Sequence, residues 1–460
     1  MTVSRREFTR LVAGGSALAA MAQLGRTAAV AQANSNFRAM VGLFLFGGND
    51  SWNMVVPNDD RHGVYLKQRN TVGIAQSALM PLSGTAFALH PSFKPLQAAW
   101  DEGALSAVLN TGTLFTPLTR TTYSQRPDLR PYNLMSHSDE QAHWQGVRAR
   151  DVNLDGFMGR MVDKMTVGAM PPLISLAGSN LALIGQRSSP LVLPSSGALN
   201  RNGYNSASKD AAVVARQAAL AAFADASGSG LVTEQTAKAV NASYDQAAMA
   251  NQIVSSTTSV VDQYFKNPAT GAALTSDVSR QLMRVARMIE ARATLGHDRQ
   301  VFFASQGGYD THNGQVGGGT NATGTQANLY ADLAMAMAGF YAAMKALGMQ
   351  DNVTLFTMSD FGRVFKGNAQ NGTDHAWGGN HLVLGGALAG GKVHGRYPDM
   401  AFGGAEDISN DGRWIPSIAT EEYIGAIARW SGVAEADMAY VLPNWSAWSG
   451  GGRGPVPLFG

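Results

Sequence analysis

The stretch Gln300–Asn313, QVFFASQGGYDTHN, joins a short apolar run to a loop of glycine, aspartate and histidine. The same pattern occurs at Ala39–Phe46, which is followed by GGND, and at Val353–Met358, which is followed by SDFGR. Short, continuous apolar runs bounded by turn residues are typical of strands that are buried on both faces, as in a parallel sheet. We therefore predict three buried strands, each of which ends in a polar loop.

The segments between these strands predict an α/β fold. The strands at 300–305 and 353–358 flank a helix expected over Ala327–Leu347, and such a β-α-β unit has parallel strands. Alternating strands and helices favour a three-layer α/β/α sandwich around a mostly parallel sheet, in one domain over residues 34–460. Further strands are expected at Ala104–Leu109, Pro171–Leu176 and His381–Leu388, and further helices at Ser92–Trp100 and Glu421–Trp430.

Residues from about 202 to 295 differ in character from the rest of the chain. They are rich in Ala, Gln and Ser, and their apolar residues have helical spacing, for example at Leu282, Val285 and Ile289. We expect an α-helical insertion here, interrupted by loops near 228–230 and 267–272.

The N-terminus has the pattern of an export signal. Arg5 and Arg6 precede a mildly apolar run at Leu11–Leu24, and small residues between 29 and 33 offer a cleavage site. The run is rich in Gly and Ala, and it is shorter than the roughly 20 strongly apolar residues that span a bilayer. We expect residues 1–33 to be a twin-arginine signal peptide. The mature protein would then be periplasmic or secreted after contact with the twin-arginine translocase, without a stable membrane span.

Composition limits the chemistry. The chain has no cysteine, so any metal must be held by nitrogen and oxygen ligands. The net charge is +2, and 15% of the residues are charged, which gives no basic patch for nucleic acid.

The polar loops place acidic and imidazole groups at one edge of the predicted sheet. Ligands of open α/β sheets bind outside the carboxyl ends of the strands, so Asp50, Asp310, His312 and Asp360 should converge there. The segment 373–381, with His375 and His381, follows closely. Asp and His without Cys are ligands of a divalent metal. The alternative is that these residues cap helices and fix loops, as Asp does in many proteins.

These motifs resemble known families. Val353–Arg363 looks like the stretch of sulfatases and phosphodiesterases that ends in Ser-Asp-His-Gly, and Asp310-Thr311-His312 resembles the step before it, as in the alkaline phosphatase superfamily. Nearly the whole mature chain resembles the domain of unknown function 1501 family of bacterial proteins, which are usually exported by the twin-arginine route. The blocks that carry this resemblance are 47–50, 136–137, 308–312, 359–363 and 372–375.

The superfamily resemblance implies two metal positions and a nucleophile. One ion would be held by Asp310 and His312 with His375 or His381, and the other by Asp50 and Asp360. A serine at a helix N-terminus would attack phosphorus or sulfur. Ser136 in Met135–Trp144 is our first choice and Ser138 our second, because this segment is similar to the nucleophile segment of metal-dependent phosphoglycerate mutases. The alternative is that Ser136 is an ordinary helix N-cap.

The sequence departs from the superfamily pattern at Phe361, which stands where a histidine is usual and cannot bind a metal. Either the second position is weak, or it borrows a ligand such as His137, or one ion binds. Arg363 follows directly. It could form two hydrogen bonds to a phosphate or sulfate, or a salt bridge to Asp360 or Asp374.

Two functions follow from these residues. The first is an exported hydrolase of a phosphate or sulfate ester, small or polymeric, that uses one or two divalent ions such as Zn, Mn or Ca. The second is a non-catalytic exported protein that keeps the fold, binds a metal and recognises a polymer or partner. A serine hydrolase is disfavoured, because no G-x-S-x-G elbow occurs on the expected strand–helix turn.

Overall fold

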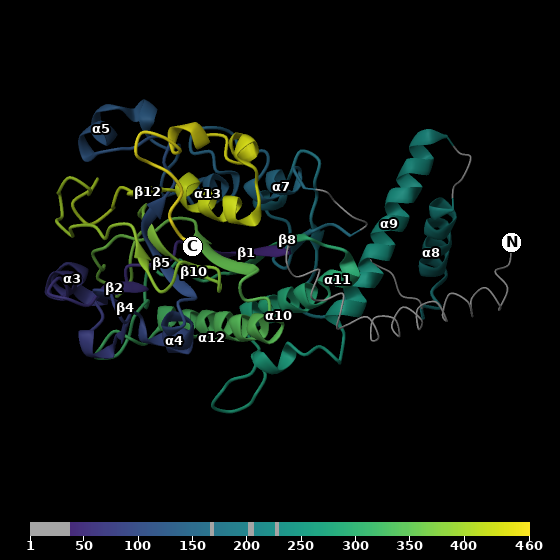
Figure 1. Cartoon of the computed structure of the whole chain (residues 1–460), viewed down its shortest axis with the longest axis horizontal. Helices are drawn as coiled ribbons and strands as arrows, with labels where there is room; N and C mark the ends of the chain where they lie inside the picture. The colour runs from purple at the N-terminus through teal and green to yellow at the C-terminus, as the bar shows by residue number, and fades with distance from the viewer. Residues whose placement is uncertain (1–36, 166–169, 201–206, 226–229) are drawn as a thin grey trace.

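The computed structural model describes residues 37–165, 170–200, 207–225 and 230–460 (Figure 1). The predicted signal peptide at 1–33 lies outside the described residues. Within the described part of the chain, no helix is both long and apolar enough to cross a membrane.

Strand β1 (Arg38–Leu45) lies at the centre of the main sheet. It pairs in parallel with β8 (Arg299–Gln306) on one side and with β9 (Val353–Ser359) on the other. Phe44 is aligned with Ser305 and with Met358, so the three strands end at the same edge. The three strands predicted from apolar runs are confirmed, and their polar loops start side by side.

The remaining strands of the main sheet are β5 (Leu105–Gly112), β6 (Leu173–Ser175), β7 (Leu191–Val192), β10 (Gly379–Leu384), β11 (Val393–His394) and β12 (Ile418–Ala419). The full sheet is mixed but mostly parallel, with the order β11-β5-β10-β9-β1-β8-β6-β7 and β12 beside β5. Strand β10 is antiparallel to both of its neighbours, whereas the other pairs of this sheet are parallel. It ends at Leu384, before the predicted end at Leu388, and Gly385 and Gly386 follow it.

Helices cover both faces of this sheet (Figure 1). Successive side chains of a strand point to opposite faces. Accordingly Val41 and Leu43 of β1 lie in one buried cluster, and Met40 and Phe44 lie in another. The first cluster includes side chains from α10 (Asp277–Glu290) and α12 (Thr325–Ala346), and the second includes side chains from α6 (His137–Gly146), α7 (Phe157–Val162) and α13 (Thr420–Ser431). The molecule is an α/β protein.

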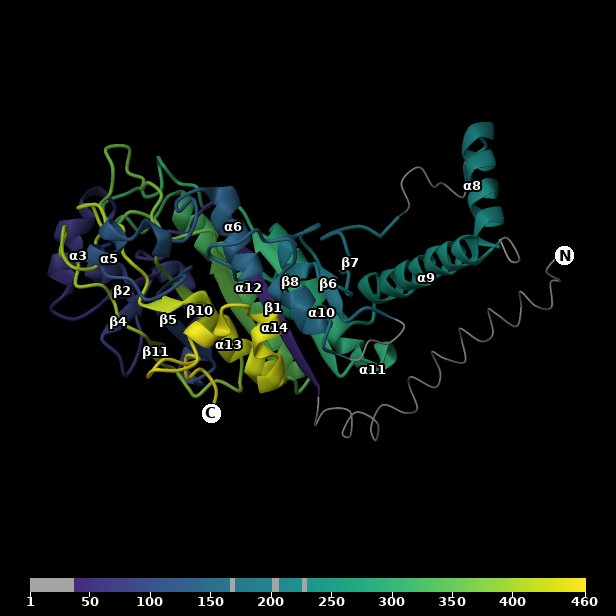
Figure 2. The same cartoon turned by 90° about the horizontal axis from the view of Figure 1, so that it is seen from above.

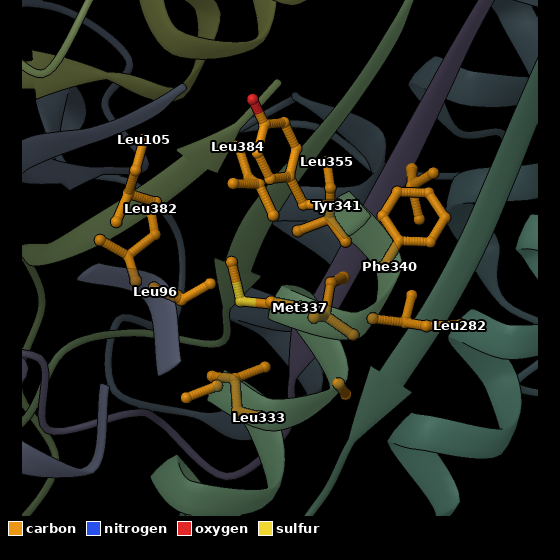
Figure 3. Packing of buried hydrophobic residues seen from close by; sticks show 14 of the residues in the cluster. Leu96, Leu105, Leu282, Leu333, Met337, Phe340, Tyr341, Leu355, Leu382 and Leu384 are labelled. Atoms are coloured by element: carbon orange, nitrogen blue, oxygen red, sulfur yellow. The ribbon is translucent and has the colours of Figure 1, made fainter. Parts of the chain in front are cut away.

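Packing in the first cluster explains the position of the long helix α12. Met337 and Phe340 of α12 lie against Leu355 of β9 and Leu282 of α10 (Figure 3). Burying each such side chain contributes about 1.5–3 kcal/mol. The crossover helix is thereby fixed across the strands whose loops carry the polar residues.

A small antiparallel sheet and several short helices complete the fold. Strand β4 (Phe87–Leu89) pairs with β2 (Val55–Pro57) and β3 (Met80–Pro81). The short helices are α3 (His62–Arg69), α4 (Gln97–Asp101), α5 (Arg120–Gln125), α11 (Arg292–Leu295) and α14 (Met438–Val441).

The predicted helical region contains two kinds of helix. Helix α8 (Ala211–Ala224) has no buried residue, and α9 (Leu231–Val254) buries only Ala237, Ala250 and Val254. Both extend away from the sheet (Figure 2). Helix α10 is instead packed on the sheet, because one of its faces is apolar along its whole length.

His381, predicted as a metal ligand, lies in the core. It is on β10, and its ring packs against Trp144 and Tyr423, with centroid distances of 4.8 and 5.5 Å. Burial lowers the pKa of His381 to about 3, against a smaller opposing effect of the Thr357 backbone. The prediction of His381 as a ligand is wrong, because the alternation of β10 turns this side chain into the packed layer.

His381 should therefore make the protein less stable in acid. Its folded-state pKa of about 3 lies below the ordinary 6.5, so the unfolded state binds one more proton between these values. The stability is complete above pH 6.5 and falls as the pH decreases through this window, by about 1.4 kcal/mol per pH unit. The free energy of unfolding, measured with urea between pH 6.5 and 4.5, should fall with decreasing pH in the wild type. In His381→Phe its slope against pH should be smaller by that amount.

Tyr423→Phe is the matched control. It changes a neighbouring ring, but burial places the pKa of Tyr423 well above 10, so no titration in this window is removed. An equal slope in His381→Phe and the wild type would show that His381 takes up no proton on unfolding.

Candidate functional site

Four side chains from distant segments meet beyond the carboxyl ends of β8 and β9. Among the residues that the structure describes, one group of three or more could hold a metal: His137, Asp310 and His375, whose ligand atoms lie within 4.8 Å of one another. His312 adjoins them, because its Nε2 is 3.0 Å from Asp310 Oδ1 and 3.0 Å from His375 Nε2. The predicted convergence of Asp310, His312 and His375 is present, and His137 joins it.

The chain brings these residues together through close backbone contacts. Gly47, just after β1, has φ +113°, and a Cβ there would lie 2.4 Å from the Asp310 nitrogen, so glycine permits the approach of the Asp310 loop. Thr373 donates its N–H to the Thr311 carbonyl at 3.1 Å, which aligns the segment before His375. His137 begins helix α6.

Each imidazole is oriented by a partner on its Nδ1. His137 Nδ1 lies 2.7 Å from Asp360 Oδ2, His312 Nδ1 lies 2.8 Å from Asp374 Oδ1, and His375 Nδ1 lies 2.9 Å from the Met135 carbonyl. These oxygens accept a hydrogen, so in each neutral ring Nδ1 carries the proton and Nε2 carries a lone pair. Such carboxylate or carbonyl partners are usual for histidines that bind a metal through Nε2.

The Nε2 atoms of all three rings face Asp310. Its carboxylate lies 3.0 Å from His312 Nε2, 3.3 Å from His375 Nε2 and 3.6 Å from His137 Nε2. His137 Nε2 is buried without a hydrogen-bond partner. Two lone-pair-bearing nitrogens 3.0 Å apart repel each other unless a cation or a proton lies between them.

These separations fit a small divalent ion. Metal–nitrogen bonds of ~2.0–2.1 Å in a tetrahedron place neighbouring ligand atoms roughly 3.3 Å apart. The three separations among Asp310 Oδ1, His312 Nε2 and His375 Nε2 are 3.0, 3.0 and 3.3 Å. The donor set and its spacing therefore suit a metal.

The electrostatics keep two of the groups in their metal-binding forms. Burial alone would raise the pKa of Asp310, but the hydrogen bond and charge of Arg363 outweigh it, and the net pKa is lowered. Burial lowers the pKa of His375, with a further lowering by Arg363 and an opposing effect of the Met135 carbonyl. At neutral pH the site then holds a carboxylate and a neutral imidazole, as metal binding requires.

Arg363 is not available to a substrate, contrary to one prediction. Its side chain is completely buried, and its Nε and Nη2 donate to the Thr373 carbonyl at 3.0 and 2.6 Å. Its Nη1 donates to the Gly47 carbonyl at 2.9 Å and to Asp310 Oδ1 at 3.0 Å. The salt-bridge prediction named Asp360 or Asp374, whereas the partner is Asp310. From this buried position, Arg363 holds together the segments that contain Gly47, Asp310 and Thr373.

Asp50 and Asp360, which were predicted to hold a second ion, are paired with other side chains of the protein. Asp50 forms a completely buried ion pair with Arg69. Asp360 accepts hydrogen bonds from His137 Nδ1 and from Gln141 Nε2 at 2.7 and 2.8 Å on one oxygen, and from the Gly47 N–H at 3.1 Å on the other. Asp360 therefore holds His137 in place, and the structure does not bring Asp50 into the group.

Ser136 occupies the N-cap position of α6, but its side chain makes no capping hydrogen bond, so it is not the ordinary N-cap of the alternative interpretation. Its hydroxyl lies 2.5 Å from Asp139 Oδ2 and 3.2 Å from Ser138 Oγ. It directly precedes His137 in the chain.

Sequence reasoning missed three supporting residues. Asp374 orients His312, Gln141 holds Asp360, and Met135, at φ +69°, presents its carbonyl to His375. Asp374 and Met135 stood next to quoted site residues, but only the folded contacts reveal their roles. Gln141 is four residues after His137, a spacing that places both on one face of a helix.

Comparisons place the chain in a family but give no activity. Curated proteins give no match. A solved structure whose title concerns metabolism of multiple glycosaminoglycans by Bacteroides thetaiotaomicron is similar over 89% of this chain and 82% of that chain. Its sequence identity is 9% and its TM-score is 0.34, values too low to assign a fold or a function to this chain. The profile described as "Protein of unknown function (DUF1501)" matches residues 38–410, and the chain therefore belongs to the DUF1501 family.

Proposed function

We propose that the protein is an exported metal-dependent hydrolase of a phosphate or sulfate ester. One divalent ion would be held by Asp310, His312 and His375, with His137 as a fourth ligand. The observation that carries this proposal is the convergence of three Nε2 lone pairs on one carboxylate, with every Nδ1 already paired. Imidazole ligands favour Zn over Ca, which prefers oxygen, and a mixed set of imidazoles and a carboxylate also admits Mn.

The ion and the residues around it would have separate roles in hydrolysis. When bound, a divalent ion supplies Lewis-acid polarisation of an ester oxygen and lowers the pKa of a hydroxyl or water. Arg363 balances the charge of Asp310 from the buried side, and Asp360 orients His137. The side chains of Asp310 and His312 are 48% and 42% exposed, which leaves one side open to an ester.

Ser136 remains the proposed nucleophile. Its hydroxyl is paired with Asp139, a carboxylate that would receive the proton when Ser136 Oγ attacks phosphorus or sulfur. The bond from phosphorus or sulfur to the ester oxygen breaks, the alcohol leaves with a proton from water, and a second water hydrolyses the ester formed on Ser136. Hydrogen bonds from Asn133 and then Ser136 lower the pKa of Asp139, so this base is weak and the ion must contribute most of the activation.

The finer parts of the proposal come from the sequence. The twin-arginine motif at 5–6 supports export to the periplasm, and the Asp310–His312 and 359–363 motifs support an alkaline phosphatase-like relationship.

A non-catalytic metal-binding protein is the second candidate. Two observations favour it: Arg363 is buried and offers no clamp for an anion, and Phe361 lines the histidines with ring centroids 4.8 Å from His137 and 4.7 Å from His375.

Metal binding should stabilise the fold. An ion at 100 times its Kd contributes about 2.7 kcal/mol, because it binds the folded state only. Adding Zn or Mn to chelator-treated protein should raise the Tm, and His375→Ala should abolish most of this rise. His394→Ala, at a buried histidine on β11, is the control and should keep the rise. An equal rise in wild type and His375→Ala would place the ion elsewhere.

Ser136→Ala should separate the two functions. If Ser136 is the nucleophile, hydrolysis of p-nitrophenyl phosphate, bis-p-nitrophenyl phosphate or p-nitrophenyl sulfate should fall by more than about 10³-fold in kcat. Metal content should stay unchanged, and Ser138→Ala should stay active. Activity in Ser136→Ala would point to water as the nucleophile. No hydrolysis by metal-loaded wild type would favour the binding protein.

A further inference from the structure

We infer that the centre binds one divalent ion and that a buried unit of Arg69, Asp50 and Gln315 replaces a second ion and holds the ligand loops in place. This inference rests on the proposed metal binding. It assigns Gln315 as a positioning residue of the metal centre.

Arg69 satisfies the charge of Asp50. Arg69 is the last residue of α3, and both side chains of the pair are completely buried. The guanidinium also donates to Asn53 Oδ1 at 2.8 Å and to the Phe365 carbonyl at 2.8 Å, so it is fixed on several sides. A permanent cation against Asp50 repels a divalent ion and takes the place of its charge.

The remaining atoms do not make a second metal site. One oxygen of Asp50, Oδ1, is buried without a partner, but a single oxygen beside a guanidinium falls short of the four or more ligands that divalent ions require. Both oxygens of Asp360 accept hydrogen bonds, and Phe361 supplies no ligand atom.

Gln315 connects Asp50 to both ligand loops. Its Nε2 donates to Asp50 Oδ2 at 2.5 Å, which fixes the orientation of the amide. Its Oε1 therefore faces two hydroxyls and accepts from Thr311 at 2.8 Å and from Thr373 at 2.6 Å. Gln315 is completely buried.

The two threonines belong to the metal-binding segments. Thr311 lies between Asp310 and His312, and Thr373 precedes Asp374 and His375. One amide oxygen thus holds together the two loops that provide three of the ligands. Outer partners of this kind preset the ligand geometry without touching the ion.

The number of ions tests the inference separately from metal binding itself. Native mass spectrometry of the full mature chain, titrated with Zn or Mn, should show saturation at one ion per chain. Two ions would overturn the inference and leave the proposed function intact. No bound ion would overturn the proposed function, and the inference would fall with it.

Gln315→Leu tests the positioning role. The affinity for Zn or Mn, measured by competition with a chelator, should fall about 10- to 100-fold, and the number of ions should stay at one. Gln300→Leu is the matched control: Gln300 is equally buried and donates to the Met288 carbonyl, at the other end of β8. It should keep the wild-type affinity even if it lowers the Tm.

Thr373→Val provides a second variant in case Gln315→Leu does not fold. It keeps the side-chain shape and removes one hydroxyl donor to Gln315, together with an acceptor of the Arg363 Nε–H, whose other acceptor, the Thr373 carbonyl, is kept. The affinity should therefore fall in the same direction by a smaller factor. Wild-type affinity in a folded Gln315→Leu or Thr373→Val variant would overturn the positioning role.

Discussion

The candidate site depends on three imidazole Nε2 atoms that are directed at one carboxylate. His312 Nε2 and His375 Nε2 lie 3.0 Å apart, and the Nδ1 atom of each ring is already paired with an acceptor. This arrangement is unfavourable for a neutral, empty cluster and favourable around a cation. The parallel strands β1, β8 and β9 make it achievable, because they deliver their loops to one edge of the sheet.

The apolar runs predicted the central strands correctly because each is buried on both faces and needs no alternation to be recognised. The convergence of Asp310 and His312 at the sheet edge could be predicted for the same reason, because the end of a buried strand fixes where the next residues lie. The roles of Asp50 and His381 could not be predicted in this way. Both have suitable side chains near the right place, but Arg69 neutralises one and the alternation of β10 buries the other.

Buried cations shape the chemistry of this protein as much as its carboxylates do. Arg69 neutralises Asp50, and Arg363 neutralises part of Asp310 while it holds the Gly47 and Thr373 backbones. Both guanidinium side chains are completely buried, so neither can bind a substrate anion. In the proposed hydrolase, recognition of an ester would then depend on the ion and on the exposed side chains of Asp310 and His312. Phe361 contributes an apolar wall where the superfamily resemblance implies a ligand.

A crystal soaked with Zn or Mn and measured at the absorption edge of that metal would locate the ion. We expect one anomalous peak at bonding distance from Asp310, His312 and His375, with His137 Nε2 turned toward it. A fully occupied peak bound by Asp50 or Asp360, or no peak among the histidines, would contradict the proposed metal centre.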